Sequence, residues 1–347
     1  MDETVIAIRN GLRWLEQQQK RDGHWAAQNG GTADLTATIQ SMRAFTASGF
    51  NHDYTVVKKA ANWLMRPEVS TSINHYFWRL GALSELHKSG IPEDLIKHDL
   101  EVARKRIKEG VSISSKLNYN AFLLDCVKNA DLNPSWLKEC VEDLSRMMQR
   151  TDLDVTPGLW GYAALGRVDS EITAGISVDS IIKSLQEVYG GFHLDGSVTA
   201  TSYFLLNCTR SKKLSDNEEI KHVLQGTATW IVSRQTKNGS WPVEQPLYDG
   251  DPQAASYHTG VAVRALAEYI QRYQPRAMSQ IALPEWRLRR TVSRISRWVL
   301  LGGALLAIVG ALILSGVFGA ISTALGVISA ILGTIAFYWD ARRKYQR

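Results

Sequence analysis

The sequence predicts an all-α protein with one large helical domain over residues 1–275 and two membrane-spanning helices behind it. Three observations carry this prediction. Apolar residues follow a helical period almost throughout the first domain, and no convincing alternating strand interrupts them. One short segment recurs with identical internal spacing. Residues 298–339 contain no Asp, Glu, Lys, Arg or His.

The first domain is long enough to bury a sizeable core, and no Gly/Ser-rich or Pro-rich linker divides it. The opening residues, MDETVIAIRN, lack the basic and then apolar pattern of a signal peptide, so we expect this domain in the cytosol. Cys126, Cys140 and Cys208 are widely spaced, which favours a reducing compartment and argues against a disulfide framework.

The recurring segment joins two aromatic residues through a glutamine and a glycine. Its copies are Trp14, Gln19, Gly23 and Trp25, then Trp230, Gln235, Gly239 and Trp241, and more weakly Ile181, Gln186, Gly190 and Phe192. The glycine is expected to end a helix at positive φ, with the second aromatic residue packed under the turn. The glutamine amide is expected to hold backbone groups of the turn and of the next helix. We therefore assign the repeat a structural role.

This spacing resembles the QW motif of the terpenoid cyclase and protein prenyltransferase superfamily, whose folds are α/α toroids of inner helices ringed by outer ones. The resemblance implies a single α6/α6 toroid over residues 1–275, with six inner and six outer helices. Expected inner helices begin near Ala33, Ser72, Lys116, Thr156, Val198 and Ser256. Expected outer helices cover residues 3–19, 54–65, 93–109, 134–149, 177–188 and 217–235.

The prenyltransferase resemblance can be tested at the zinc site. The zinc-binding histidine of those enzymes corresponds to His258, at the start of the last inner helix, and their Asp and Cys ligands correspond to Thr199 and Thr201. Threonine is a poor zinc ligand and one histidine alone cannot hold the metal, so we expect no metal and no cofactor. We favour a hydrogen-bonding role for His258 at the ring mouth.

The cyclase resemblance can be tested at the DxDD motif, whose middle aspartate protonates an alkene or epoxide. Asp152 and Asp154 match its first two acidic positions, and Val155 replaces the last one. The resemblance implies Asp154 as the acid, supported by Asp152 and His258. The alternative, which we favour, is that Asp152, Asp154 or Thr156 caps the inner helix whose first residue is Pro157.

A concave centre lined by aromatic side chains is the default ligand site of such a ring. The candidate ligand-binding residues on the inner helices are Trp78, Tyr119, Trp160, Tyr203 and Tyr257. They would bind an isoprenoid or other apolar ligand and could contact a carbocation or ammonium through cation–π interactions. The alternative is that they fill the space between the two helical layers.

The charge-free segment of 42 residues, 298–339, has the length of two spans, because one span needs roughly 20 apolar residues. Two glycines within residues 315–319 permit the reversal. Trp298 and Trp339 stand where interfacial aromatic residues are expected. The alternative is a hairpin buried in the core of a soluble fold.

Charge predicts the orientation of this hairpin. Residues 285–297 carry +4 (five Arg, one Glu) and residues 340–347 carry +3 (four basic residues, one Asp), so the rest of the chain contributes −1 to the total of +6. Both clusters should face the cytoplasm of a bacterial-type inner (plasma) membrane, with the toroid and both termini. Residues 276–297 are then a basic juxtamembrane linker and residues 340–347 a basic tail. We expect membrane lipid as a partner and no nucleic acid.

Two functions from different classes follow. The first is a membrane-anchored protein that binds an isoprenoid or other apolar ligand in the toroid. A catalytic version of it would be a degenerate class II cyclase that uses an acidic residue as proton donor. The second is a non-catalytic receptor whose toroid senses a ligand or partner, while the two spans oligomerise and perturb the membrane, as in bacterial defence. Small residues such as Gly319, Thr323 and Gly326 permit such helix packing. The aromatic centre favours the first function, and the incomplete acid and zinc sites favour the second.

Overall fold

The computed structural model describes residues 2–27, 32–66, 73–87, 90–110, 113–149, 163–165, 182–183, 185–188, 191–243 and 255–281. These residues belong to one compact unit, Met1–Ile281, and a second unit comprises Ala282–Arg347. The predicted spans, the tail and most of the predicted linker lie outside the described residues. Within the described part of the chain, no helix combines the length and the apolarity that a bilayer crossing requires.

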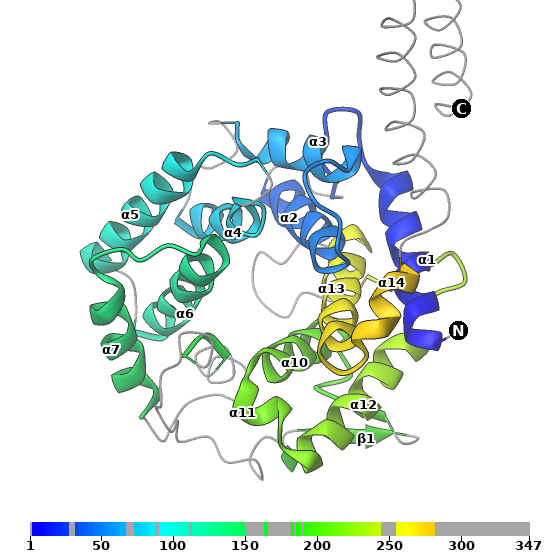
Figure 1. The fold of residues 1–347 in the computed structure, drawn as a ribbon. Helices are drawn as coiled ribbons and strands as arrows, with labels where there is room; N and C mark the ends of the chain where they lie inside the picture. The colour runs from blue at the N-terminus through cyan, green and yellow to red at the C-terminus, as the bar shows by residue number, and fades with distance from the viewer. Residues whose placement is uncertain are drawn as a thin grey trace, which may run out of the picture. The chain divides into compact units, whose positions relative to one another are not determined.

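The first unit is built of two concentric layers of helices (Figure 1). The inner layer contains α2 (Thr32–Ala47), α4 (Ile73–Ser84), α6 (Ile113–Ala130), α10 (Val198–Arg210) and α13 (Ala255–Tyr273). The outer layer contains α1 (Glu3–Gln18), α3 (Thr55–Leu64), α5 (Glu93–Gly110), α7 (Leu137–Met148) and α12 (Glu218–Ser233). Outer and inner helices alternate along the described chain, which confirms the predicted helical toroid. The predicted inner helix from Thr156 lies almost entirely outside the described residues.

One predicted outer helix, residues 177–188, is wrong at its end. Gln186–Val188 forms strand β1, which pairs antiparallel with β2 (Gly191–His193). Valine and aromatic residues favour the extended conformation, and β2 packs on α12, where the ring of His193 lies 5.0 Å from that of Trp230. Gln186 therefore lies in a strand and not in the predicted outer helix.

The compact unit also continues past the predicted boundary at residue 275. The short helices α11 (Lys212–Ser215), η3 (Pro275–Ala277) and α14 (Met278–Ile281) complete the described elements. The last two pack against α13, and α14 also packs against α1. Ile281 is fully buried. The first residues of the predicted linker thus belong to the toroid, because their apolar side chains extend its core.

Side-chain caps explain where several of these helices begin. The Asp2 carboxylate accepts a hydrogen bond from the Thr4 amide at 2.8 Å before α1. Ser197 accepts one from Ala200 before α10, and Asn217 caps α12 in the same way. Each cap satisfies an amide that the first helical turn leaves without an intrahelical partner.

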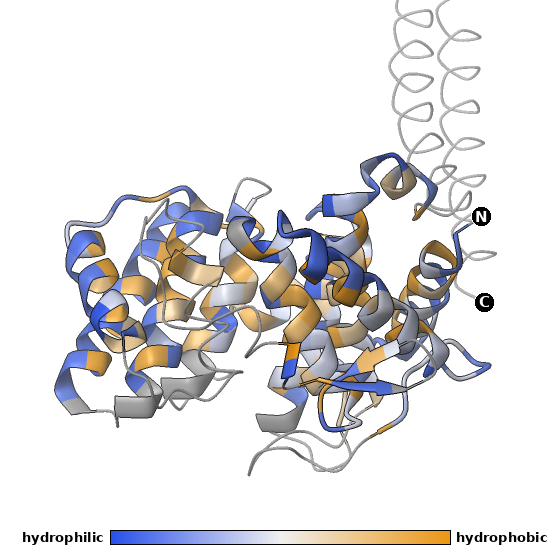
Figure 2. Cartoon of the chain, turned by 90° about the horizontal axis from the view of Figure 1, so that it is seen from below, coloured by the Kyte–Doolittle hydropathy of each residue, from blue (hydrophilic) through white to orange (hydrophobic). Residues whose placement is uncertain are grey.

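The inner helices run parallel to one another and approach closely. Contacts between α10 and α13 keep a nearly constant offset along the chain, from Thr199 with His258 to Arg210 with Glu268. A Cβ atom on Gly260 of α13 would lie 2.6 Å from the backbone carbon of Gln40 in α2. Glycine is therefore required where the first and last inner helices meet and close the ring. Figure 2 shows hydrophilic and hydrophobic residues alternating along the surrounding helices, as expected of a layer with one buried side.

The first two copies of the repeat make matching contacts. Gln19 donates to the carbonyls of Gly23 and Val56, and Gln235 donates to those of Gly239 and Ala7. Each amide thus joins its own turn to the next outer helix, α3 in the first copy and α1 in the second. Both glycines have positive φ, and a Cβ on either would clash with the backbone of that neighbouring helix.

The tryptophans of the repeat link the turn to the inner layer. The Trp25 indole donates to the Leu15 carbonyl at 2.7 Å, and Trp241 donates to Ile231 at 2.7 Å. Their backbone amides donate to hydroxyls on inner helices, Thr38 for Trp25 and Thr259 for Trp241. Trp14, which opens the first copy, is half-buried on α1, and Trp230 on α12 is buried.

Replacing Gln235 by leucine should lower the free energy of unfolding by about 1–2 kcal/mol, because two partly buried carbonyls lose their donor. Chemical denaturation followed by circular dichroism measures this change. Gln225→Leu is the control, because the side chain of Gln225 is exposed on α12. An equal effect of both substitutions would show that the link between α12 and α1 contributes nothing.

Candidate functional site

A cavity lies at the centre of the ring between the inner helices. The described residues that line it are Arg43, Trp78, Ala121, Phe122, Asp125, Tyr203, Leu206, Asn207, Arg210 and Arg264. They come from α2, α4, α6, α10 and α13, so every described inner helix contributes. Half of these residues are polar or charged, because a network of buried charged side chains reaches the cavity.

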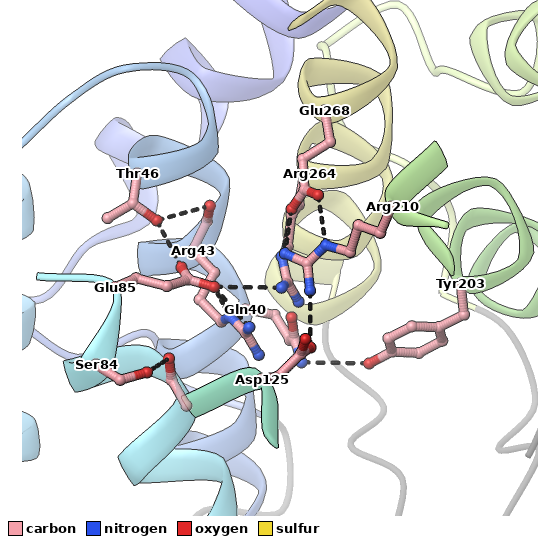
Figure 3. A network of polar contacts seen from close by, with 11 residues as sticks. Gln40, Arg43, Thr46, Ser84, Glu85, Asp125, Tyr203, Arg210, Arg264 and Glu268 are labelled. Carbon is pink, nitrogen blue, oxygen red and sulfur yellow. Dashed lines mark hydrogen bonds and ion pairs between the residues drawn. The ribbon is translucent and has the colours of Figure 1, made fainter. Parts of the chain in front are cut away.

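The first half of the network is centred on Glu85, directly after α4. Its carboxylate accepts hydrogen bonds from Arg43 at 2.6 and 2.8 Å and from Arg264 at 3.2 Å. The Thr46 hydroxyl donates to the other carboxylate oxygen at 2.9 Å. Figure 3 shows these side chains converging from α2 and α13 on the carboxylate. One negative charge is thus shared between two guanidinium groups.

The second half of the network is centred on Arg210, the last residue of α10. Its guanidinium forms a bidentate pair with Glu268 of α13, with both distances 2.5 Å. A third hydrogen bond, of 3.0 Å, reaches Asp125 of α6. Arg264 joins the halves, because its Nε lies 3.4 Å from Glu268. The network thereby links α4 and all the other described inner helices at their C-terminal halves.

Burial and neighbouring charges set the pKa values of the network. Burial would raise the pKa of Glu85, but Arg43 and Arg264 outweigh it and lower this pKa to about 2. Burial acts to lower the pKa of Arg210, whereas Glu268 and Asp125 raise it more. Burial, Arg43 and Arg210 together lower the pKa of Arg264, which stays protonated at neutral pH. Glu85, Arg210 and Arg264 are therefore charged at neutral pH.

Four of the five predicted aromatic residues are described by the structure, and they fall into three groups. Trp78 and Tyr203 line the cavity. Tyr257 is buried, and its hydroxyl lies 3.3 Å from that of Tyr203, which also accepts a hydrogen bond from Gln40. Tyr119 stacks on Phe77 with ring centroids 4.5 Å apart. Trp160 lies outside the described residues.

His258 is buried, and its Nδ1 lies 2.7 Å from the Thr199 hydroxyl. The structure thus brings together two of the three positions that correspond to the zinc ligands. Thr201 instead bonds to the backbone of Leu194. The described residues contain no group of three or more His, Cys, Asp or Glu side chains that could hold a metal ion. Asp152 and Asp154 lie outside the described residues.

The sequence interpretation missed the charge network. A signal for it exists, because Arg43, Asp125 and Arg264 are single charged residues within the apolar runs SMRAF, FLLDCV and VAVRAL. A charge in such a run must be paired when the helix is buried on all sides. The sequence does not reveal the partners, since the Glu85 carboxylate lies 42 positions from Arg43 and 179 positions from Arg264.

Comparisons with known proteins identify the fold and no more. No family model and no curated protein matches the chain. The apo structure of the type II terpene cyclase MstE from Scytonema aligns with a TM-score of 0.53 and 15% identity, covering 80% of this chain and 98% of that one. An MstE variant in complex with the substrate geranylgeranyl dihydroxybenzoate aligns with a TM-score of 0.50 and 15% identity, covering 76% and 96%.

A glycosidase in complex with glucose is equally similar, with a TM-score of 0.52 and 11% identity over 77% of this chain and 96% of that one. The class that the fold defines is therefore the α/α toroid, which a terpene cyclase and a glycosidase share. Because both identities are low, function must be argued from the site.

Proposed function

We propose that this protein binds an isoprenoid or similarly apolar chain at the centre of its ring and is held at a membrane by residues 298–339. The observation that carries the proposal is the aromatic wall of the cavity, formed by Trp78, Phe122 and Tyr203. The Trp78 and Phe122 rings meet edge to face, with centroids 5.6 Å apart. Such a wall offers a large apolar contact area with little side-chain freedom to lose on binding.

The geometry favours binding over carbocation chemistry. A developing carbocation is stabilised by aromatic faces and carboxylates but destabilised by nearby guanidinium groups. Three arginines line this cavity, and Arg43 lies over the Phe122 ring, 5.8 Å from its centroid. Cyclisation would also require an acid, and Asp154 is the candidate from the sequence.

Native mass spectrometry of the full chain purified in detergent, with lipid extraction, tests whether an isoprenoid co-purifies. Added geranylgeraniol should bind, and Trp78→Ala should weaken its binding about tenfold, which corresponds to about 1.4 kcal/mol. Trp63→Ala is the control, because Trp63 stacks on His24 at the outer layer. Equal affinity of the wild type and Trp78→Ala would contradict the proposal.

Turnover separates a binding protein from an enzyme. Incubation with geranylgeranyl substrates, followed by product extraction, should give no cyclised product if the ring only binds. If a product does form, Asp154→Asn should reduce the rate at least a hundredfold, as expected for loss of a general acid. Unchanged turnover in Asp154→Asn would exclude Asp154 as the acid.

A second candidate is a receptor whose ligand controls oligomers of the membrane segment. The charge network forms the floor of the cavity. The specific observation in favour of this candidate is that the network joins every described inner helix. A ligand bound there would act on all of these helices at once. Ligand-dependent leakage of dye from liposomes containing the full chain would support this candidate, and ligand-independent behaviour would contradict it.

A further inference from the structure

The central cavity is lined by a polar side chain that the described residues leave partly without a partner. The side chain of Asn207 on α10 lines the cavity, yet it is only 3% exposed, and its Nδ2 has no hydrogen-bond partner among the described residues. A buried amide donor without a partner costs about 1–3 kcal/mol. Such a group is expected where a ligand completes the hydrogen bonding.

Two arginines face the same cavity with bonding capacity to spare. Arg43 and Arg264 are 2% and 3% exposed, and both line the cavity. Their described hydrogen bonds to Glu85 use Nε and Nη2 of Arg43 and Nη2 of Arg264. Within the described part of the chain, Nε of Arg264 has no hydrogen bond and lies 3.4 Å from Glu268. Figure 3 shows both guanidinium groups directed at the Glu85 carboxylate.

The charge balance is locally positive at this point. The whole network pairs three arginines with three acids, but Arg43 and Arg264 share one carboxylate. Of the remaining acids, Glu268 forms the bidentate pair with Arg210 and reaches Arg264 at 3.4 Å, and Asp125 accepts a single hydrogen bond from Arg210. The pKa of Arg264 is lowered first by burial and then by the neighbouring charges of Arg43 and Arg210. A negative group would relieve this repulsion.

We propose that Arg43, Arg264 and Asn207 bind a phosphate-type oxyanion at the floor of the cavity. Planar guanidinium groups match phosphate oxygens, and hydrogen bonds to a charged group are the strong ones. The site is separate from the Thr199–His258 pair, because Asn207 lies eight positions after Thr199 on α10, which corresponds to about 12 Å along the helix axis. This inference rests on the proposed function, which supplies the apolar part of the ligand, and it adds a phosphate-type group at one end of that ligand.

The test uses the full chain in detergent and three probes in isothermal titration calorimetry: inorganic pyrophosphate, geranylgeranyl phosphate and geranylgeraniol. Pyrophosphate should bind, and geranylgeranyl phosphate should bind at least tenfold more tightly than geranylgeraniol. Asn207→Leu should weaken binding of both phosphates about tenfold or more and leave geranylgeraniol unchanged. Thr209→Val is the matched control: it removes a buried hydroxyl of α10 that has no hydrogen bond among the described residues, at a position that does not belong to the described cavity lining.

The outcomes separate the two proposals. Binding of pyrophosphate alone supports the oxyanion site with a free phosphate as its source and contradicts an apolar ligand. Preference for the prenyl phosphate supports a phosphate head group as the source. Binding of geranylgeraniol without any gain from phosphate overturns the oxyanion site and leaves the proposed function standing. Equal weakening by Asn207→Leu and Thr209→Val also overturns it, and circular dichroism confirms that both variants are folded.

Discussion

Glu85→Gln should destabilise the toroid by about 3–5 kcal/mol, the range for a buried ion pair that loses one partner. The substitution keeps the shape of the side chain and removes its charge. Two buried guanidinium groups, those of Arg43 and Arg264, then face each other without the carboxylate that both now contact. Urea denaturation followed by tryptophan fluorescence measures the change.

Glu93→Gln is the matched control for this prediction. Glu93 pairs with Lys97 one turn away on α5, but both side chains are about half exposed, at 46% and 56%. Exposed pairs of this kind contribute little, because water screens them. If Glu93→Gln destabilised the protein as much as Glu85→Gln, the shared buried carboxylate would not be what holds the inner helices together.

The same residue predicts a pH dependence. The pKa of Glu85 is lowered from 4.5 to about 2, so its stabilising contribution is fully present above pH 4.5. The contribution is lost as the pH falls from 4.5 through about 2, where the folded state also binds the proton, and it amounts to about 3 kcal/mol. Wild-type stability should therefore fall more steeply over this range than that of Glu85→Gln. Parallel curves would contradict the assignment.

Trp241→Ala should destabilise the toroid by about 3–5 kcal/mol, the usual cost of removing a large aromatic side chain from a core. Trp241 is fully buried, and its indole N–H donates to Ile231 at the end of α12. A Cβ built on Gly11 of α1 would touch its ring at 3.0 Å, so the cavity would open between α12 and α1. Thermal unfolding followed by circular dichroism measures the loss.

Trp241→Phe separates packing from hydrogen bonding in this result. Phenylalanine retains much of the ring volume but removes the indole donor, which leaves the Ile231 carbonyl with the Arg234 amide alone, so the loss should be smaller, about 1–3 kcal/mol. If Trp241→Ala were as stable as Trp241→Phe, packing of the ring under the turn would not contribute to the stability of the toroid.

The toroid was predictable from the sequence because its signals are local. The spacing from Trp14 to Trp25 recurs from Trp230 to Trp241, and each copy closes a turn within a few residues. The helical period predicted where the described helices lie. It failed at Gln186–Val188, where pairing with Gly191–His193 and packing on α12 decide the conformation.

The candidate site was predictable only in part. Trp78 and Tyr203 could be placed at the ring centre because a helix start and a period indicate which positions face inward. Tyr119 lies on the same layer, but its stacking on Phe77 depends on how α4 and α6 approach each other. The distance between α4 and α6 cannot be predicted from the pattern of residues along the chain.

The sequence by itself determined the helical repeat, the charge-free segment at residues 298–339 and the absence of a complete zinc or DxDD ligand set. Only the tertiary structure decided that the ring centre carries a charge network as well as aromatic residues. Arg43, Glu85, Arg210 and Arg264 are distant in the chain and meet because parallel inner helices bring their C-terminal halves to one level. A buried charge is tolerated only beside its partner, and that partner is chosen by the closure of the ring.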